Sequence, residues 1–263
     1  MSTLHVFAGS VEHPVRPEIR RIGLRDLRDA LARGIDDFRA MPSHVIFLSL
    51  LYPIVGLVLA RLSFGYDVVP LLFPLVAGFA LVGPFVALGL YELSRRREQG
   101  RPAGWRDAFG VLRNPAIDSI ALLGGLLMLL FVIWLAVAEG LYQSLFGYGV
   151  PESLSGFLAE VVGTAHGRTL LIAGNAIGFL FALVVLVISV VSFPMLLDRD
   201  IGAVTAMQTS VRAVARNPVA MAAWGLIVAA ALALGSLPFF IGLAVVLPVL
   251  AHATWHLYRR VVV

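Results

Sequence analysis

The sequence predicts an all-α polytopic membrane protein with six transmembrane helices. Of its 263 residues, 59% are hydrophobic and only 14% are charged, whereas soluble domains typically have about 45–50% apolar and about 25% charged residues. The mean hydropathy is +0.91. Several apolar runs also reach the roughly 20 residues of helix needed to cross a bilayer core of about 30 Å. An ordinary soluble domain is therefore excluded.

Residues 1–43 are predicted to form a cytoplasmic amino-terminal arm that contains an amphipathic helix. The arm holds seven arginines and no apolar run of the signal-peptide kind, so we expect it not to be a cleaved leader. Opposite charges are spaced i,i+4 along one side, in the pairs Arg25 with Asp29 and Arg33 with Asp37. This predicts an apolar face that either lies on lipid headgroups or packs on the helix bundle. The face consists of Leu24, Leu27, Leu31, Ile35 and Phe38.

Residues 44–263 are predicted to form a six-span membrane domain. The last two spans are joined only by residues 236–238, which predicts a tight helical hairpin. The one sizeable external loop covers residues 139–168, and its apolar stretch 154–162 predicts a short re-entrant or surface helix. The predicted spans are 44–62, 68–93, 117–138, 169–197, 219–235 and 239–258.

The arginines predict the orientation of these spans. All 20 Lys+Arg residues are arginine, and 18 of them lie in the two termini and the loops after the second and fourth spans. Because basic residues accumulate in cytoplasmic loops, we expect both termini to be cytoplasmic in a multi-pass protein of the bacterial inner membrane. The basic side chains expected at the membrane interface are Arg25, Arg28, Arg95, Arg96, Arg97, Arg212 and Arg216.

Three degenerate helical-hairpin repeats are predicted, each preceded by a cytoplasmic amphipathic helix. The cytoplasmic segments end in similar Pro motifs at 39–42, 113–115 and 216–218, which places Pro in the first turn of the next helix, where its missing N–H costs nothing. Such repeats occur in transporters, although duplication of a stable hairpin would leave the same pattern. The second and third amphipathic helices are predicted from Trp105, Phe109, Leu112, Val204, Val211 and Val214, and the second arms share Pro84, Pro194 and Pro248.

His252 and His256 are spaced i,i+4 in the sixth span, so both imidazoles fall on one helical face. Two imidazoles at this spacing can bind a metal ion or ligate haem, with Glu92, Asp198 or His44 as further ligands. The alternative is that His256 belongs to an aromatic interface belt and that His252 forms a hydrogen bond between helices. The chain has no cysteine, which excludes thiolate metal sites.

Asn175 lies in the fourth span and has either of two roles, helix association or a solute path. The prolines Pro84, Pro194 and Pro248 kink helices and could expose carbonyl groups along such a path. No Asp, Glu or Arg lies near the middle of any span, which weakens the case for a proton pump or an ion channel. Nucleotide-binding and hydrolase motifs are absent, so we expect no enzymatic activity, no cofactor and no nucleic-acid partner.

The segments 192–200, 213–218 and 247–259 resemble a domain-of-unknown-function family of bacterial integral membrane proteins. Some members carry the label cytochrome c oxidase subunit I-like. The resemblance extends from about Ile19 to the end of the chain, and it implies a membrane scaffold without a known reaction. An oxidase core needs six histidine ligands over several helices, whereas the six histidines here include two in the arm and one in the external loop.

Three functional hypotheses follow from the sequence. The first is a non-enzymatic accessory, assembly or scaffold factor that contacts membrane lipids and other membrane proteins. The second is a permease or channel for a small neutral or lipid-like solute. The third is a metal- or haem-linked assembly factor for a respiratory complex, acting through His252 and His256. Substrate, partner and oligomeric state stay open.

Overall fold

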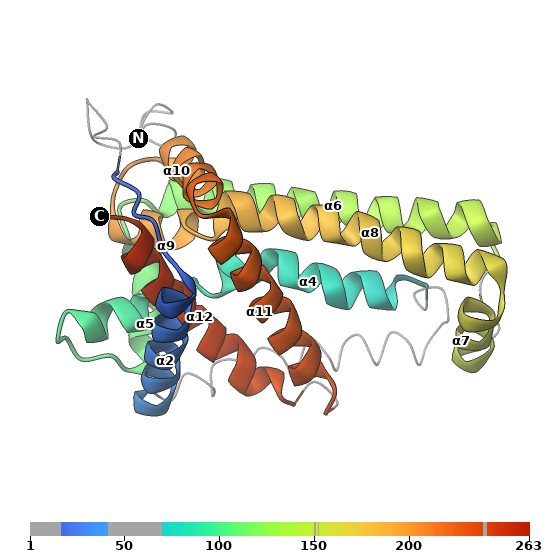
Figure 1. Cartoon of the computed structure of the whole chain (residues 1–263), viewed down its shortest axis with the longest axis horizontal. Helices are drawn as coiled ribbons and strands as arrows, with labels where there is room; N and C mark the ends of the chain where they lie inside the picture. The colour runs from blue at the N-terminus through green and yellow to red at the C-terminus, as the bar shows by residue number, and fades with distance from the viewer. Residues whose placement is uncertain (1–16, 42–69, 150, 152, 239–240) are drawn as a thin grey trace. The chain divides into compact units, whose positions relative to one another are not determined.

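The computed structural model describes residues 17–41, 70–149, 151, 153–238 and 241–263, and this part of the chain is helical. Its only extended pairing is an isolated antiparallel bridge between Ile19 and Val262. The all-α prediction is therefore confirmed for these residues. The helices are α2 (Leu24–Ala40), α4 (Leu72–Val86), α5 (Leu88–Glu98), the 3₁₀ helix η2 (Trp105–Arg113), α6 (Ile117–Phe146), α7 (Leu154–Gly163), α8 (Ala165–Ser189), α9 (Ser192–Asp198), α10 (Ala203–Arg216), α11 (Pro218–Ser236) and α12 (Leu243–Val261) (Figure 1).

Three stretches of the described chain are long and apolar enough to cross a membrane. They are Ile117–Phe146, Ala165–Asp198 and Pro218–Ser236, and they coincide with the third, fourth and fifth predicted spans. The first predicted span, 44–62, lies outside the described residues, and the described parts of the second and sixth, 68–93 and 239–258, are not among these stretches. Six spans and a threefold repeat therefore stay predictions.

Much of the predicted external loop 139–168 is helical, and its external position stays a prediction. Helix α6 continues through residues 139–146 and ends before Gly147, whose φ is +76°, a left-handed conformation that favours glycine after a helix. No proline interrupts the chain between 139 and 146, so nothing stops the helix earlier. The expected short helix is confirmed as α7, whose first turn is capped by the Ser153 hydroxyl accepting from Gly156 N–H at 3.0 Å.

Proline has different effects on the three arms that contain it. Helices α8 and α9 are separated at residues 190–191, as expected because Pro194 has no N–H to donate to the carbonyl of Val190. Helices α4 and α5 are separated at Ala87, three residues after Pro84. Helix α12 runs as one helix through Pro248. Two of the three arms are thus interrupted.

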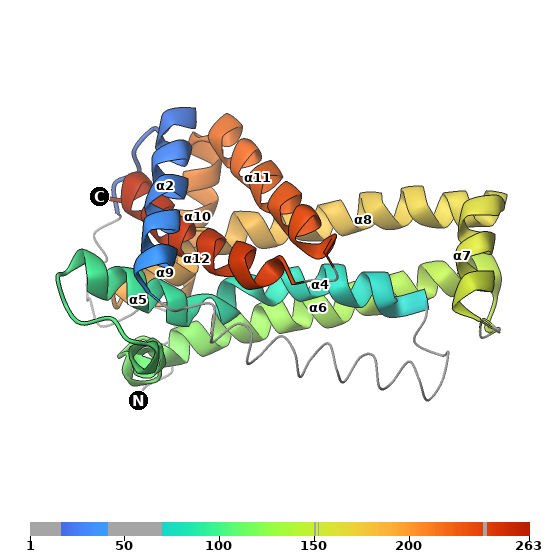
Figure 2. The ribbon, with the colours of Figure 1, turned by 90° about the horizontal axis from the view of Figure 1, so that it is seen from below.

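The chain divides into two compact units, the first comprising residues 1–50, 84–124 and 186–263, the second residues 51–83 and 125–185. In the first unit, α2 lies along α12 (Figure 1), and α11 and α12 form a V-shaped hairpin (Figure 2). A Cβ added at Gly34 would lie 2.7 Å from Ala253 Cβ and 2.8 Å from Val249 O. Only glycine at this position allows α2 to approach α12 so closely.

Only Leu27 of the predicted apolar face is among the buried residues of α2, and the headgroup alternative for this face stays open. The buried residues of the helix are Leu27, Ala30, Gly34 and Asp37, while Leu24 is 64% exposed and Ile35 is 38% exposed. The predicted pair between Arg33 and Asp37 is wrong, because Asp37 turns inward. The cause is the close approach of α2 to α12. Small side chains of α2 fit between the two helices, whereas the large apolar ones lie at the edge of the contact and stay partly exposed.

The other two amphipathic helices also leave predicted apolar residues exposed. η2 buries Ala108 and Val111 and exposes the predicted residues Trp105, Phe109 and Leu112. Helix α10 buries small side chains and exposes Val204 and Val211. Its buried residues are Ala203, Ala206, Thr209, Ser210 and Ala213.

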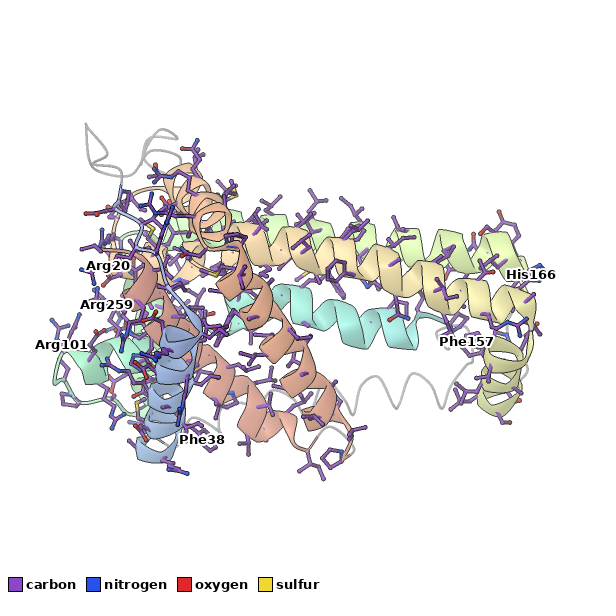
Figure 3. The ribbon with its side chains drawn as sticks, in the orientation of Figure 1. Arg20, Phe38, Arg101, Phe157, His166 and Arg259 are labelled. Carbon is purple, nitrogen blue, oxygen red and sulfur yellow. The ribbon has the colours of Figure 1, made fainter. Side chains whose placement is uncertain are left out.

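The second unit is organised around Trp134 of α6. Its indole N–H donates to the carbonyl of Pro74 at 2.9 Å, and its ring lies 5.6 Å from the ring of Phe181. A Cβ at Gly178 would lie 3.1 Å from the Trp134 ring, so this glycine lets α8 pack on the indole. Figure 3 shows Phe157 and His166 where α7 meets α8.

Candidate functional site

Five polar side chains from three helices meet in the first unit: Asp37 of α2, Ser94 and Arg97 of α5, and His252 and His256 of α12. We call this set the Asp37 network. The Ser94 hydroxyl donates to Asp37 Oδ2 at 2.5 Å, and His256 Nε2 lies 2.8 Å from the same oxygen. Arg97 donates to Asp37 Oδ1. Ser94 Oγ in turn lies 2.7 Å from His252 Nδ1.

The core of the network is closed to solvent. Ser94 and His252 are fully buried, and Asp37 is 3% exposed. Burial alone would raise the pKa of Asp37, but the hydrogen bonds from His256, Ser94 and Arg97 outweigh it and hold this pKa below its ordinary value. Asp37 is therefore a buried carboxylate whose negative charge is satisfied by three donors.

The ionised state of Asp37 determines the direction of the other hydrogen bonds. A carboxylate only accepts, so the Ser94 proton points to Asp37, and the Ser94 oxygen is left to accept from His252 Nδ1–H. A serine nucleophile instead gives its proton to an unprotonated imidazole. Ser94 does not do so here, and this geometry favours a structural role for the hydroxyl.

His256 has one nitrogen without a partner. Its Nε2 points to Asp37, while Nδ1 is buried and has no hydrogen-bond partner among the described residues. An unsatisfied buried polar atom usually marks an unseen partner or a functional constraint. His256 is therefore the member of the network that can still form a hydrogen bond, through Nδ1.

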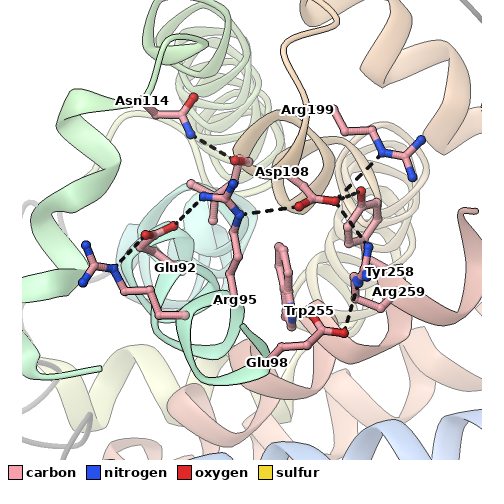
Figure 4. Close-up of polar contacts among 11 residues, drawn as sticks. Glu92, Arg95, Glu98, Asn114, Asp198, Arg199, Trp255, Tyr258 and Arg259 are labelled. Carbon is pink, nitrogen blue, oxygen red and sulfur yellow. Dashed lines mark hydrogen bonds and ion pairs between the residues drawn. The ribbon is translucent and has the colours of Figure 1, made fainter. Parts of the chain in front are cut away.

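A second polar cluster, the Asp198 network, joins α5, α9 and α12 (Figure 4). Asp198 Oδ2 accepts from the Tyr258 hydroxyl at 2.8 Å and from Arg259 at 3.4 Å. Arg95 Nε lies 3.5 Å from Asp198 Oδ1. Glu98 accepts from Trp255 Nε1 at 3.1 Å and from Arg259 Nε at 3.2 Å. These bonds join α5, α9 and the end of α12, where the second, fourth and sixth predicted spans end. These ends are predicted to face the cytoplasm.

Glu92 and Asp198 do not lie with the histidine pair. Glu92 accepts from Arg95 at 3.3 Å and from Arg96 at 3.0 Å, and Asp198 belongs to the Asp198 network. Within the described ranges, no group of three or more His, Cys, Asp or Glu side chains could hold a metal ion. His44 lies outside these ranges. The metal or haem site stays a prediction, while the predicted hydrogen bond of His252 between helices is confirmed by its contact with Ser94.

Asn175 bonds within its own helix. Its Nδ2 donates to the carbonyl of Leu171 at 2.7 Å, and its side chain is exposed. The predicted roles as helix glue or solute path therefore stay predictions.

The basic residues expected at the interface fall into two groups. Arg95, Arg96 and Arg97 bind the carboxylates of the two networks or their neighbours, whereas Arg25, Arg28 and Arg216 are exposed. Arg212 is half-buried and lines a pocket.

Two asparagines connect segments that are distant in the sequence. Asn217 Oδ1 accepts from Ile22 N–H at 2.8 Å, and its Nδ2 donates to the carbonyl of Arg20 at 3.0 Å. Asn114 Nδ2 donates to the carbonyl of Leu197 at 3.0 Å. The recurring Asn-Pro motif marks both asparagines in the sequence, but only its proline was interpreted there. Asp37 and Ser94 gave no signal, because nothing local distinguishes them from solvent-facing residues.

Residues 71–198, which contain α5, Ser94 and the Asp198 carboxylate, match one family model, described as predicted integral membrane protein (DUF2189). This segment is similar to the DUF2189 family. The resemblance to a membrane-protein family of unknown function is thus confirmed for it. The DUF2189 match does not extend to the motifs at 213–218 and 247–259, from which the resemblance was also inferred. No curated protein and no solved structure matches the chain.

Proposed function

We propose that this chain is a non-enzymatic accessory or scaffold protein of the bacterial inner membrane that associates with other membrane proteins through exposed helix faces. Asn175 is the observation that carries the proposal. It lies near the middle of α8, on a face where Ile172 is 73% exposed and Phe179 is 66% exposed. An amide on this face lacks water in a bilayer, and Leu171 satisfies only one of its hydrogens.

A partner helix would satisfy the remaining groups of Asn175. Helix association in membranes uses polar side chains in this way, at about 0.6 kcal/mol on average and up to about 2 kcal/mol per hydrogen bond. The large side chains around Asn175 supply the apolar area of contact. The geometry therefore supports a protein-binding face on α8.

The two polar networks of the first unit also support the scaffold role. Asp37, Glu92, Glu98 and Asp198 all bind arginines of the same chain. Their charges hold α2, α5, α9 and α12 together and leave the apolar faces for other proteins. The proposed orientation puts both termini in the cytoplasm and these networks at the cytoplasmic ends of the predicted spans, because 18 of the 20 arginines would fall on that side of six spans.

Photocrosslinking in native membranes tests the proposal. A crosslinking residue replaces Ile172, one turn before Asn175, in an otherwise unchanged chain and in an Asn175→Leu chain. We expect a protein adduct of defined mass whose yield falls about three- to tenfold in N175L, because about 0.6–1.4 kcal/mol of association energy is lost.

Thr169→Val is the matched control for this experiment. Thr169 is also exposed on α8 and also bonds a carbonyl four residues earlier, that of Ala165, at 3.1 Å. Its substitution should leave the adduct unchanged. Adducts with lipid alone, or within the chain alone, contradict the proposal. A saturable solute flux in proteoliposomes that N175L or P194A abolishes would instead support the permease hypothesis.

A further inference from the structure

A pocket of about 450 Å³ lies between the end of α8 and one side of α10. Its walls combine apolar side chains with neutral polar ones and a single cation. The lining residues are Ile188, Thr205, Met207, Gln208, Thr209, Val211 and Arg212. All of them belong to the first unit, so the pocket is formed within one compact body.

Arg212 differs from the arginines of the two networks because it has no acidic partner among the described residues. Its only hydrogen bond there runs from a terminal nitrogen to Thr209 Oγ1 at 3.4 Å, and its Nε is buried without a partner. By contrast, Arg97 and Arg259 each bind a carboxylate. The Arg212 guanidinium therefore retains both its positive charge and most of its hydrogen-bonding capacity.

These groups fit a phosphate that is joined to an apolar chain. A guanidinium matches two phosphate oxygens with parallel N–H donors, and the hydroxyl of Thr205 and the amide of Gln208 provide neutral donors beside it. Ile188, Met207 and Val211 provide apolar walls. A free phosphate would use only the polar part of the pocket, whereas a phospholipid would use both parts.

The position of α10 in the chain favours a lipid. The helix lies between two stretches able to cross a membrane, Ala165–Asp198 and Pro218–Ser236, so a short connection keeps it near the bilayer surface. Val204 and Val211 are exposed on it, as expected of a helix that lies at the headgroup boundary.

We propose that this pocket binds the phosphate of an anionic phospholipid through Arg212, with an acyl chain against Ile188 and Val211. The proposal rests on the membrane placement in the proposed function but does not require a protein partner. Loss of lipid binding and loss of the α8 adduct are therefore separate outcomes.

Native mass spectrometry of the full chain in mild detergent, titrated with phosphatidylglycerol or phosphatidylcholine, tests the proposal. We expect one phosphatidylglycerol to bind more tightly than phosphatidylcholine, and Arg212→Gln to weaken phosphatidylglycerol about tenfold or more, as loss of a charged hydrogen bond implies. Arg216→Gln is the matched control, because Arg216 is exposed on the same helix outside the pocket. R216Q should change the affinity for phosphatidylglycerol by no more than about twofold.

A second variant keeps the proposal testable if R212Q is unstable. Val211→Trp fills the pocket but retains the charge, and it should also weaken phosphatidylglycerol. Equal losses in R212Q and R216Q would indicate diffuse attraction and overturn the proposal. Equal affinity for the two lipids in the unchanged chain would do the same. Binding of inorganic phosphate that depends on Arg212, without binding of phosphatidylglycerol, would assign the pocket to a soluble phosphate.

Discussion

His256 Nε2 lies 2.8 Å from Asp37 Oδ2, although the two residues are 219 positions apart in the chain. Asp37 belongs to the amino-terminal amphipathic helix α2, and His256 belongs to the last helix, α12. Ser94 and Arg97 of α5 bind the same carboxylate. One buried charge thereby connects the two ends of the chain through its middle.

Replacement of Asp37 by Asn should destabilise the protein. The variant keeps the size of the side chain but removes the charge that Arg97 and His256 share. Loss of one partner from a buried ion pair costs about 3 kcal/mol or more, so we expect a clearly lower thermal midpoint in detergent, followed by tryptophan fluorescence. Asp36→Asn is the control, since Asp36 is an exposed neighbour on the same helix. Equal thermal midpoints for D37N and the unchanged chain would show that the Asp37 network does not stabilise the protein.

The contribution of Asp37 to stability should depend on pH. The folded-state pKa of Asp37 is lowered from its ordinary value of 3.8, so this contribution is fully present above that value and is lost as the pH falls through the lowered folded pKa. The difference in thermal midpoint between the unchanged chain and D37N should be constant from about pH 7 to about pH 5 and should shrink below about pH 4. If the difference in thermal midpoint instead grows as the pH falls, the folded-state pKa of Asp37 is not lowered.

Gly34→Ala should weaken the contact between α2 and α12. The added Cβ would meet Ala253 backbone N at 2.7 Å and Val249 O at 2.8 Å, and backbone atoms cannot move aside as a flexible side chain can. Overpacking of this kind costs about 1–3 kcal/mol. Gly125→Ala in α6 is the comparison, because its Cβ meets nothing within 4 Å among the described residues. In equilibrium unfolding, G34A should lose stability while G125A gains up to about 1 kcal/mol.

The helices were predictable because their signals are local. The apolar run of α11 predicted residues 219–235, and the helix is Pro218–Ser236. The packing faces were not predictable from hydrophobicity. Gly34 and Ala30 pack inward because they permit close approach, while Leu24, a stronger apolar signal, is exposed. A pattern of small residues at i,i+4, read together with the apolar stripe, would have indicated the correct face of α2.

The candidate site was predictable in part. The spacing of His252 and His256 correctly placed them on one helix face, but their partners come from α2 and α5. Asp37 was expected in a pair with Arg33, because i,i+4 spacing is visible in the sequence and a contact across 219 residues is not. Glu92 and Asp198 were expected near the histidines from repeat positions alone. Glu92 instead binds Arg95 and Arg96 of its own helix, and Asp198 binds Arg95 of α5 and Arg259 of α12.

Asn217→Ala should release the segment that precedes α2. The substitution removes the bonds from Asn217 to Ile22 N–H and to the Arg20 carbonyl, each worth about 1 kcal/mol. Arg20 and Arg21 are exposed, so trypsin can report local opening directly. We expect cleavage after these residues to accelerate about tenfold, since the opening equilibrium shifts by roughly 1–2 kcal/mol.

Two further variants separate this local effect from a general loss of stability. Asn217→Asp keeps the acceptor for Ile22 but loses the donor to Arg20, so its cleavage rate should be intermediate. Asn114→Ala removes a bond to the Leu197 carbonyl and should leave cleavage after Arg20 unchanged. If N114A and N217A accelerate cleavage equally, Asn217 does not hold this segment specifically. If only N217A does so, the Asn of the third Asn-Pro motif fixes the amino-terminal segment where α10 ends and α11 begins.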